Sequence, residues 1–366
     1  MPIGAHEGIG SSADMPEPDS VEVFAPGRVN LIGDHTDTTG GLVLPIAIEL
    51  GTTIVARRGH PRVVLSSGEV EGVAEIALDT KDPASLEPSW ARYVAGVVAE
   101  LHPREGFVGT ARTTIPVARG LSSSAALEVA VALALLGVSG TADADRTKLA
   151  LACQRGEQRA SGVQCGVMDQ LASLCGIAGH ALLIDCTTLA IVPVEVPASF
   201  DIVVIDSGVR RELRNSAYGE RRAELEAAEA AIGPLRVATT ADLQRLRDRV
   251  VRRRARHVLS ENARVRAMAV ALLAEDAVAA GELMQESHAS LRDDFECTTP
   301  AIDATVARLN AMRGVHGARM TGGGWGGCIV ALAERGAIEE GRCVRAWGPA
   351  TCVRAAGPSS PRTPLR

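Results

Sequence analysis

The sequence has few lysines and few aromatic residues. Of its 38 basic residues only two, Lys81 and Lys148, are lysines, and aromatic residues make up 2% of the 366 positions. No glycine is followed by lysine anywhere in the chain, which excludes a Walker A phosphate loop. A mechanism that needs a catalytic lysine has just these two candidates. With so few rings, the core must be filled by leucine, valine, isoleucine and alanine.

The charge and the cysteines exclude further classes. A net charge of −6 and a pI near 5.8 argue against a general nucleic-acid binder. No two of the eight cysteines have C-x-x-C spacing, so neither a zinc ribbon nor a thioredoxin-type site is indicated. The longest apolar stretch, residues 125–138, contains Glu128 and is shorter than the roughly 20 residues of a membrane span. No signal sequence is recognisable. We expect a cytoplasmic monomer without nucleic-acid or membrane partners.

The length is enough for two domains of about 150 residues each. Predicted strands and helices are mixed without strict alternation, which favours an α+β fold. We expect a disordered N-terminus at 1–20, an N-terminal domain at 21–190 and a C-terminal domain at 191–335. Residues 336–366 are rich in Arg, Gly, Pro and Cys and lose the periodic patterning. This atypical tail indicates either a flexible terminus or an out-of-frame gene end.

Apolar periodicity predicts the individual elements. The first strand is expected to stop at Pro26-Gly27. Further strands are expected at 54–58, 62–67, 112–117, 181–186, 200–207 and 328–333. Helices are expected at 90–102, 122–138 and 147–160, within 216–257, and at 262–288.

The segment PVARGLSSSAA, residues 116–126, lies between a predicted strand and a predicted apolar helix. A helix N-terminus carries unpaired N–H groups and positive partial charge, so it can bind an anion. We expect Gly120, Leu121, Ser122, Ser123, Ser124 and Ala125 to hold a phosphate. The alternative is that these serines are an ordinary N-cap.

The segment GARMTGGGWGGC, residues 317–328, has five glycines among the six residues 322–327. Such a run costs conformational entropy unless the backbone needs unusual angles or a close approach. We expect Gly322, Gly323 and Gly324 to be a second phosphate contact. A plain tight loop is the alternative.

The segment GRVNLIGDHTDTTGGLVLP, residues 27–45, crowds Arg28, Asp34, His35 and Asp37 into ten positions. Several hydrogen-bonding groups on one loop suit a polyhydroxylated ligand. The alternative is that the aspartates form turns and that the histidine is structural.

The segment EQRASGVQCGVMDQ, residues 157–170, carries Glu157 on a predicted helix and Asp169 twelve residues later. One carboxylate could hold Mg²⁺ and the other could accept a proton, since carboxylates suit both roles.

Together these four segments resemble the GHMP kinases, most closely the branch that phosphorylates galactose. SAYGERRAE, RARHVLSENARV and SHASLRDDFE also match segments of that branch, and all seven occur in the same order. The resemblance covers about residues 21–333. It implies a two-lobed α+β fold with the active site between the lobes. It also implies transfer of the γ-phosphate of ATP to the anomeric hydroxyl of a sugar, galactose above all.

The resemblance also implies roles for particular residues. Asp169 corresponds to the catalytic carboxylate, and Arg28 to its partner, which stabilises charge on the transferred phosphoryl group. Ser124 and Glu157 correspond to the Mg²⁺ ligands. The residues that correspond to sugar-binding positions are Asp34, His35, Asp37, Gly166 and Tyr218, and Trp90 is expected near the adenine.

The sequence departs from the family pattern on the sugar side. Thr38 stands where a tyrosine is usual, and Asp34 stands where a glutamate is usual. The acceptor could therefore be a related sugar: N-acetylgalactosamine, a uronic acid, arabinose or a secondary-metabolite sugar. A non-catalytic regulator that senses galactose and ATP is a further hypothesis, although Arg28, Glu157 and Asp169 favour an enzyme.

Overall fold

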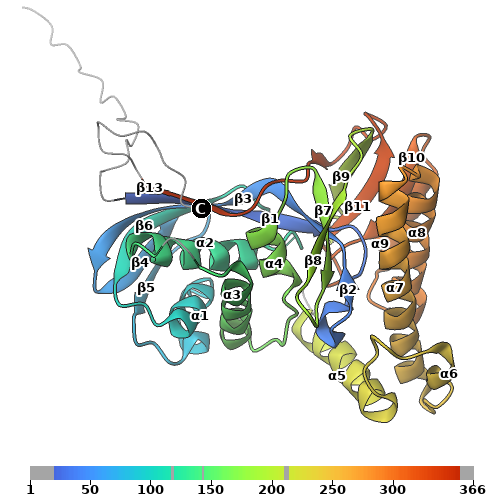
Figure 1. Cartoon of the computed structure of the whole chain (residues 1–366), viewed down its shortest axis with the longest axis horizontal. Coiled ribbons are helices and arrows are strands. Elements are labelled where there is room, and N and C mark those ends of the chain that lie inside the picture. The colour runs from blue at the N-terminus through green and yellow to red at the C-terminus, as the bar shows by residue number, and fades with distance from the viewer. Residues whose placement is uncertain (1–19, 117–118, 142–143, 210–213, 355–366) are drawn as a thin grey trace, which may run out of the picture.

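The computed structural model describes residues 20–116, 119–141, 144–209 and 214–354. Helices and strands are mixed along the chain, so the expected α+β class is confirmed. Two lobes lie side by side in Figure 1, each with a sheet and its own helices. Within the described ranges, no helix is both long enough and apolar enough to span a membrane.

The N-terminal lobe is built on a six-stranded sheet. Its strands are β1 (Ser20–Asn30), β3 (Pro45–His60), β4 (Arg62–Ser67), β5 (Val73–Ala77), β6 (Gly106–Thr113) and β13 (Thr351–Arg354). Their order is β13-β1-β3-β6-β4-β5, and β4 runs parallel to β6 while the other pairs are antiparallel. Helices α1 (Ala91–Leu101), α2 (Ser123–Val138), α3 (Arg146–Ser161) and α4 (Met168–Cys175) gather below this sheet in Figure 1.

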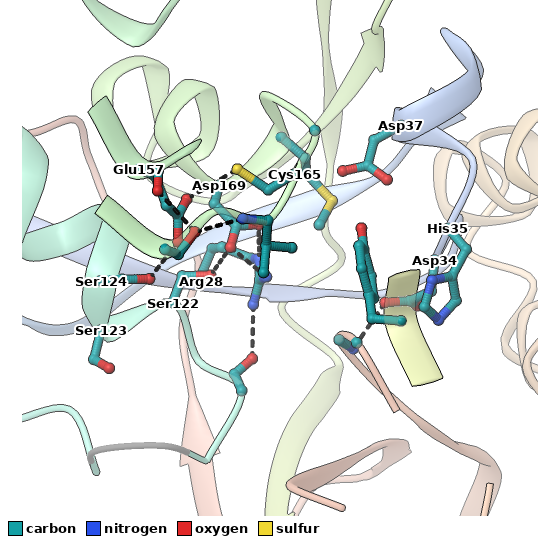
Figure 2. Close-up of a pocket in the computed structure, with 18 of the residues that line it drawn as sticks. Arg28, Asp34, His35, Asp37, Ser122, Ser123, Ser124, Glu157, Cys165 and Asp169 are labelled. Carbon is teal, nitrogen blue, oxygen red and sulfur yellow. Dashed lines mark hydrogen bonds and ion pairs between the residues drawn. The ribbon is translucent and has the colours of Figure 1, made fainter. Parts of the chain in front are cut away.

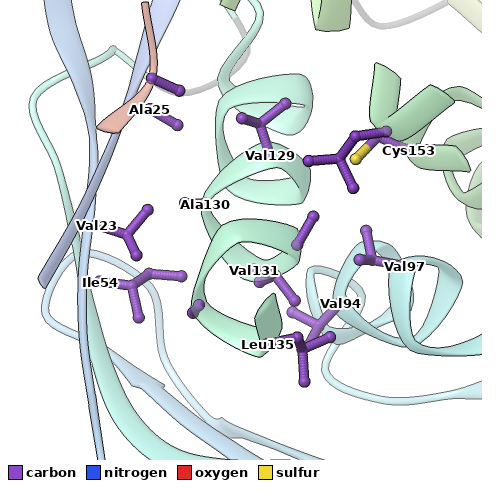
Figure 3. Close-up of a cluster of buried hydrophobic side chains, with 14 of the residues drawn as sticks. Val23, Ala25, Ile54, Val94, Val97, Val129, Ala130, Val131, Leu135 and Cys153 are labelled. Carbon is purple, nitrogen blue, oxygen red and sulfur yellow. The ribbon is translucent and has the colours of Figure 1, made fainter. Parts of the chain in front are cut away.

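The core of this lobe lies between the sheet and α2. Val23 and Ile54 point from the strands toward α2, whose Val129 and Leu135 face the other helices (Figure 3). All four side chains are at most 1% exposed, and each contributes about 1.5–3 kcal/mol by burial. The cluster is almost wholly aliphatic, as the shortage of aromatic residues predicted, although Phe107 belongs to it.

The C-terminal lobe has a four-stranded antiparallel sheet. Its strands are β9 (Phe200–Asp206), β10 (Val315–Met320), β11 (Cys328–Glu334) and β12 (Arg342–Val344), in the order β10-β11-β9-β12. Its helices are α5 (Arg214–Ile232), α6 (Thr240–Leu243), α7 (Arg249–Leu273), α8 (Ala277–Ser290) and α9 (Pro300–Asn310), with a π-helical turn at Leu291–Phe295. The helix expected at 262–288 is therefore two helices, which separate at residues 274–276.

A small third sheet stands between the lobes. It contains β2 (Leu42–Val43), β7 (His180–Asp185) and β8 (Ile191–Glu195), paired in the order β2-β7-β8. The boundary that we expected at residue 190 falls at the turn of the β7–β8 hairpin. A shared apolar cluster joins Val29 and Leu44 to Val204 and Val330 of the C-terminal sheet. The two-domain division stays a prediction, since the lobes are continuous in their packing.

The expected end of the first strand at Pro26-Gly27 was wrong. β1 continues to Asn30, and its register against β3 shifts between Pro26 and Arg28. A Cβ on Gly27 would lie 2.6 Å from the carbonyl oxygen of Leu121, so this close approach requires glycine. The backbone N–H of Arg28 donates to the same oxygen at 3.2 Å. The irregularity therefore brings Arg28 against the segment that precedes α2.

The chain end also differs from the expected tail. Residues 336–354 include β12, which pairs with β9, and β13, which pairs with the edge of β1. Between them the N–H of Trp347 donates to the oxygen of Ala47 at 2.9 Å. These strands are three and four residues long, too short for a periodic pattern to register. Residues 355–366 of the expected tail, and residues 1–19 of the expected disordered N-terminus, lie outside the described residues.

The packing of β12 leads to a stability prediction. Val344 is 3% exposed in the shared apolar cluster, so Val344→Asp buries an unpaired carboxylate and should lower the free energy of unfolding by about 3 kcal/mol. Arg345 is exposed, and Arg345→Ala should change the free energy of unfolding by no more than about 0.5 kcal/mol. Urea denaturation measures both variants. Equal, small effects would show that this end of the chain is not part of the fold.

Candidate active site

A cavity lies between the two lobes, and most of the residues that sequence analysis selected line it. Its walls include residues from β1, the start of α2, α3, α4, α5 and the glycine-rich turn (Figure 2). The selected residues on these walls are Arg28, Asp34, His35, Asp37, Gly120, Ser122, Ser123, Ser124, Glu157, Gly166, Asp169, Tyr218, Gly322 and Gly323. Leu121, Ala125 and Gly324, which we also expected at the phosphates, are not among its lining residues.

Arg28 and Asp169 form a two-pronged ion pair at the centre of the cavity. Nε of Arg28 donates to Oδ1 of Asp169 at 2.7 Å, and Nη2 donates to Oδ2 at 2.6 Å. The Arg28 side chain is 7% exposed, whereas that of Asp169 is 24% exposed and accessible from the cavity. Such bidentate pairs fix orientation as well as charge. The Arg28 guanidinium therefore holds the Asp169 carboxylate in one plane.

Residues 119–126, the described part of the segment expected to bind phosphate and called the phosphate segment below, contact the same pair. Nη1 of Arg28 donates to the carbonyl oxygen of Gly120 at 2.7 Å, and the hydroxyl of Ser122 donates to Oδ2 of Asp169 at 2.5 Å. Ser122 has a φ of 60°, and among the described residues no side chain caps the start of α2. The hydroxyls of Ser122 and Ser124 bond to carboxylates instead. The ordinary N-cap alternative is therefore not what the structure has.

Ser124 and Glu157 fit a magnesium site. The hydroxyl oxygen of Ser124 lies 2.9 Å from Oε1 of Glu157, and both residues line the cavity. Neighbouring ligands of an octahedral Mg²⁺ at 2.0–2.1 Å are also separated by about 2.9 Å. Among the described residues no group of three or more His, Cys, Asp or Glu could hold a metal ion. A cation here would need further oxygens, which a bound polyphosphate provides.

The loop that follows β1 supplies the other end of the cavity. Asp34 is 2% exposed, and its Oδ2 lies 2.5 Å from Nη2 of the fully buried Arg319. Its Oδ1 accepts the N–H of Gly322 at 2.7 Å. Asp34 therefore joins the loop after β1 to the glycine-rich turn, while its buried Oδ2 accepts no hydrogen bond among the described residues.

His35 is held between rings. Its imidazole stacks on Phe295 with centroids 4.3 Å apart, and the ring of Tyr218 lies 5.8 Å away. Burial, with His257 and Arg319 nearby, keeps the pKa of His35 well below its usual value, so the ring is neutral at pH 7. Its buried Nε2 has no hydrogen-bond partner among the described residues. A ligand hydroxyl would satisfy this nitrogen.

Asp37 faces the chain around Gly166. A Cβ on Gly166 would lie 1.9 Å from Oδ2 of Asp37, so the contact requires glycine at that position. Burial, together with the negative charges of Asp169 and Asp34, raises the pKa of Asp37 to about 7. The cavity thus holds a carboxyl that changes charge near neutrality.

Helix α7 supports the loop that follows β1 with polar side chains that sequence reasoning did not select. Nε2 of His257 lies 3.1 Å from the carbonyl oxygen of Asp34, and Oε1 of Glu261 accepts the N–H of Gly33 at 3.0 Å. Oδ1 of Asn262 accepts the N–H of Leu42 at 2.7 Å. Burial alone would raise the pKa of Glu261, but His257, Arg264 and Arg319 lower it to about 2. The sequence did contain a signal for these residues, because they lie on the apolar face of the segment RARHVLSENARV.

A second cavity adjoins the first and shares Tyr93, Ser123 and Ser124 with it. Trp90, Leu127 and Val70 give this second cavity an apolar wall. Trp90, expected near the adenine, therefore lies beside the phosphate segment.

Comparisons with known proteins agree with this geometry. Residues 14–58 match the galactokinase galactose-binding signature, and residues 92–177 and 268–350 match the N-terminal and C-terminal domains of GHMP kinases. A galactokinase from Roseiflexus sp. (strain RS-1) is 42% identical over 342 residues, which are 88% of this chain and 85% of that protein. The chain belongs to the galactokinase family of GHMP kinases.

Solved structures of the same superfamily share the fold. The crystal structure of Lactococcus lactis galactokinase complexed with galactose is 33% identical, with a TM-score of 0.85 over 93% of this chain and 96% of that one. Methanococcus jannaschii mevalonate kinase is 18% identical, with a TM-score of 0.60 over 86% and 90%, which shows a common fold alone. The two-lobed GHMP fold that the sequence predicted is confirmed. ATP is the co-substrate of this family of kinases.

The raised pKa of Asp37 leads to a pH-dependent prediction for this galactokinase family member. Because the folded protein favours the protonated carboxyl, the stability of the wild type relative to Asp37→Asn should fall as the pH rises from about 4 to about 7. Urea denaturation at several pH values without sugar measures this difference. The exposed Asp82 provides a control, since Asp82→Asn should show no such trend. A constant difference between wild type and Asp37→Asn would contradict the prediction.

Proposed function

We propose that this protein transfers the γ-phosphate of ATP to the anomeric hydroxyl of galactose. The observation that carries the proposal is the position of the Arg28–Asp169 pair. It touches the phosphate segment through Gly120 and Ser122 and faces the cavity that contains Asp37 and His35. A sugar bound at one end and a triphosphate at the other would meet at Asp169.

Asp169 and Arg28 divide the chemistry between them. Asp169 orients the anomeric hydroxyl and accepts its proton while the hydroxyl oxygen bonds to the γ-phosphorus. The bond from that phosphorus to the oxygen bridging to the β-phosphate breaks, and ADP leaves. Arg28 stabilises negative charge on the transferred group, since a guanidinium stays protonated at any working pH. Phosphoryl transfer requires mainly such positioning and charge stabilisation.

The phosphates would lie at the start of α2, with Ser124 and Glu157 as ligands of Mg²⁺. Bound Mg²⁺ would neutralise charge on the β- and γ-phosphate oxygens. Gly322 and Gly323 also line the cavity and would lie against the same phosphates, with Gly323 offering its backbone N–H because that of Gly322 donates to Asp34. The cavity beside Trp90 would accept the adenine, because its apolar wall suits a flat base.

Asp37, the neutral ring of His35, the Gly166 backbone and Tyr218 would contact the sugar. Asp34 belongs to this set as well: Gly322 and Arg319 hold its carboxylate, and its buried Oδ2 accepts no hydrogen bond among the described residues. Because Thr38 and Asp34 depart from the usual residues on the sugar side, a kinase for a related sugar is the second candidate.

The cytoplasmic location and the monomeric state are also proposals. No disulfide joins the eight cysteines, all of which lie in the described residues, and reduced thiols fit the cytoplasm.

An acceptor panel tests the function. We expect ADP release with galactose at a kcat/KM at least tenfold above that with N-acetylgalactosamine, galacturonate, arabinose, talose or glucose. Selectivity of this size is within reach of a site that hydrogen-bonds sugar hydroxyls. A higher value with another sugar would move the assignment to that sugar. ATP and sugar binding without ADP release from any of them would make the protein a sensor.

Asp169→Asn tests the catalytic assignment. The amide keeps the shape of the side chain but cannot accept a proton, so kcat should fall by about 10³-fold or more. The affinity for ATP, measured by calorimetry, should stay within about threefold of the wild type. The exposed Asp79 provides a control, and Asp79→Asn should leave kcat unchanged. A variant that retains wild-type kcat would remove Asp169 from the chemistry.

A further inference from the structure

Two buried polar residues beside the cavity have no part in the chemistry described so far. Glu128 on α2 and Gln170 on α4 are both 0% exposed. Glu128 lies one helical turn after Ser124 on the same face of α2, and Gln170 directly follows Asp169. Neither residue is among those that line the cavity. Both are connected through hydrogen bonds to Glu157, which does line the cavity.

The amide of Gln170 bridges two carboxyl groups. Its Nε2 donates to Oε2 of Glu128 at 2.9 Å and to Oε2 of Glu157 at 2.8 Å. An amide nitrogen carries two hydrogens, so both are used in this bridge. The other oxygen of Glu157, Oε1, accepts the hydroxyl proton of Ser124 at 2.9 Å. The Glu157 carboxylate is therefore held on both sides, with Oε1 turned toward the phosphate segment.

Glu128 is the last residue in this chain of hydrogen bonds, which begins at Ser124. Burial, with Glu157 nearby, raises the pKa of Glu128 well above its usual value. Its Oε2 is one of the two acceptors that the Gln170 amide has among the described residues. Without it, one N–H of the Gln170 amide would lose its partner and the amide could rotate away from Glu157.

We propose that Glu128 is a positioning residue for the metal site: through Gln170 it fixes the carboxylate of Glu157 in the orientation that Mg²⁺ requires. The inference rests on the proposed function, in which Ser124 and Glu157 hold the metal. Partners behind a ligand commonly change metal affinity by 10–100-fold when they are removed. The bridge also links α2, α3 and α4, so the metal carboxylate and Asp169 are held by one network.

The test measures metal binding rather than turnover. Mn²⁺ bound to the enzyme–ADP complex is followed by electron paramagnetic resonance, and the Kd is compared between variants. Glu128→Met replaces the carboxyl with an apolar side chain of similar length and should raise the Kd for Mn²⁺ about tenfold. Glu128→Gln retains an acceptor oxygen for Gln170 and should stay within about threefold of the wild type. The affinity for ADP without metal should be the same in both.

Controls separate positioning from packing. Val131 is fully buried on the same helix, and Val131→Ala should lower the melting temperature without changing the Kd for Mn²⁺. If Glu128→Met does not fold, Glu128→Asp carries the same test, since it withdraws the carboxyl from Gln170 by one methylene. A variant that loses stability like Val131→Ala but binds Mn²⁺ within twofold of wild type would overturn the inference.

The variant Glu157→Gln tests the proposed metal site separately from the role of Glu128. If Glu157→Gln weakens Mn²⁺ binding while Glu128→Met and Glu128→Asp do not, the metal site stands and the role of Glu128 fails. If Glu157→Gln leaves Mn²⁺ binding unchanged, the proposed metal site itself is wrong, and the role of Glu128 is overturned with it.

Discussion

The ion pair between Arg28 and Asp169 is the interaction on which the arrangement of the cavity depends. It joins β1 to the first turn of α4, and Arg28 and Asp169 each also bond to the segment before α2. Three separate parts of the N-terminal lobe are thereby fixed relative to one carboxylate. Removing either partner would leave a buried or half-buried charge without compensation, which is far more costly than losing an exposed salt bridge. The pair therefore joins β1, α4 and the segment before α2 at one point of the cavity wall.

A second ion pair plays the same part between the lobes. Asp34 of the loop after β1 meets Arg319 of β10, and both side chains are almost fully buried. Helix α7 adds Glu261, which lies 3.9 Å from Arg319 and accepts the N–H of Gly33. Because these charges are buried away from water, each is stabilised only while its partner stays in place. The end of the cavity that Asp34, His35 and Asp37 line is consequently shaped by contacts of the C-terminal lobe as well as by its own loop.

Much of the site could be predicted from the sequence because its residues are grouped in short segments. Glycine, serine and charged residues in GRVNLIGDHTD and GLSSSAA stand out against apolar neighbours, and the cavity brings Arg28, Ser124 and Asp169 together. Residues that contact the cavity-lining side chains or loops without lining the cavity themselves were missed. Glu128 sits in an apolar helix, and His257, Glu261 and Asn262 lie on the apolar face of α7, so periodicity could indicate their burial but not which groups they contact. The strand beyond Gly27 and the short strands of the chain end depend on distant partners, which no local pattern contains.

The charges in the cavity explain why its three aspartates behave differently. Arg28 compensates Asp169 and Arg319 compensates Asp34, each at 2.5–2.7 Å. Asp37 has no guanidinium at that distance among the described residues, and burial, with the other two carboxylates nearby, raises its pKa to about 7. An uncharged carboxyl can donate as well as accept a hydrogen bond, as a neutral polyol demands. The two compensated aspartates therefore set the electrostatic environment in which the third changes charge near neutrality.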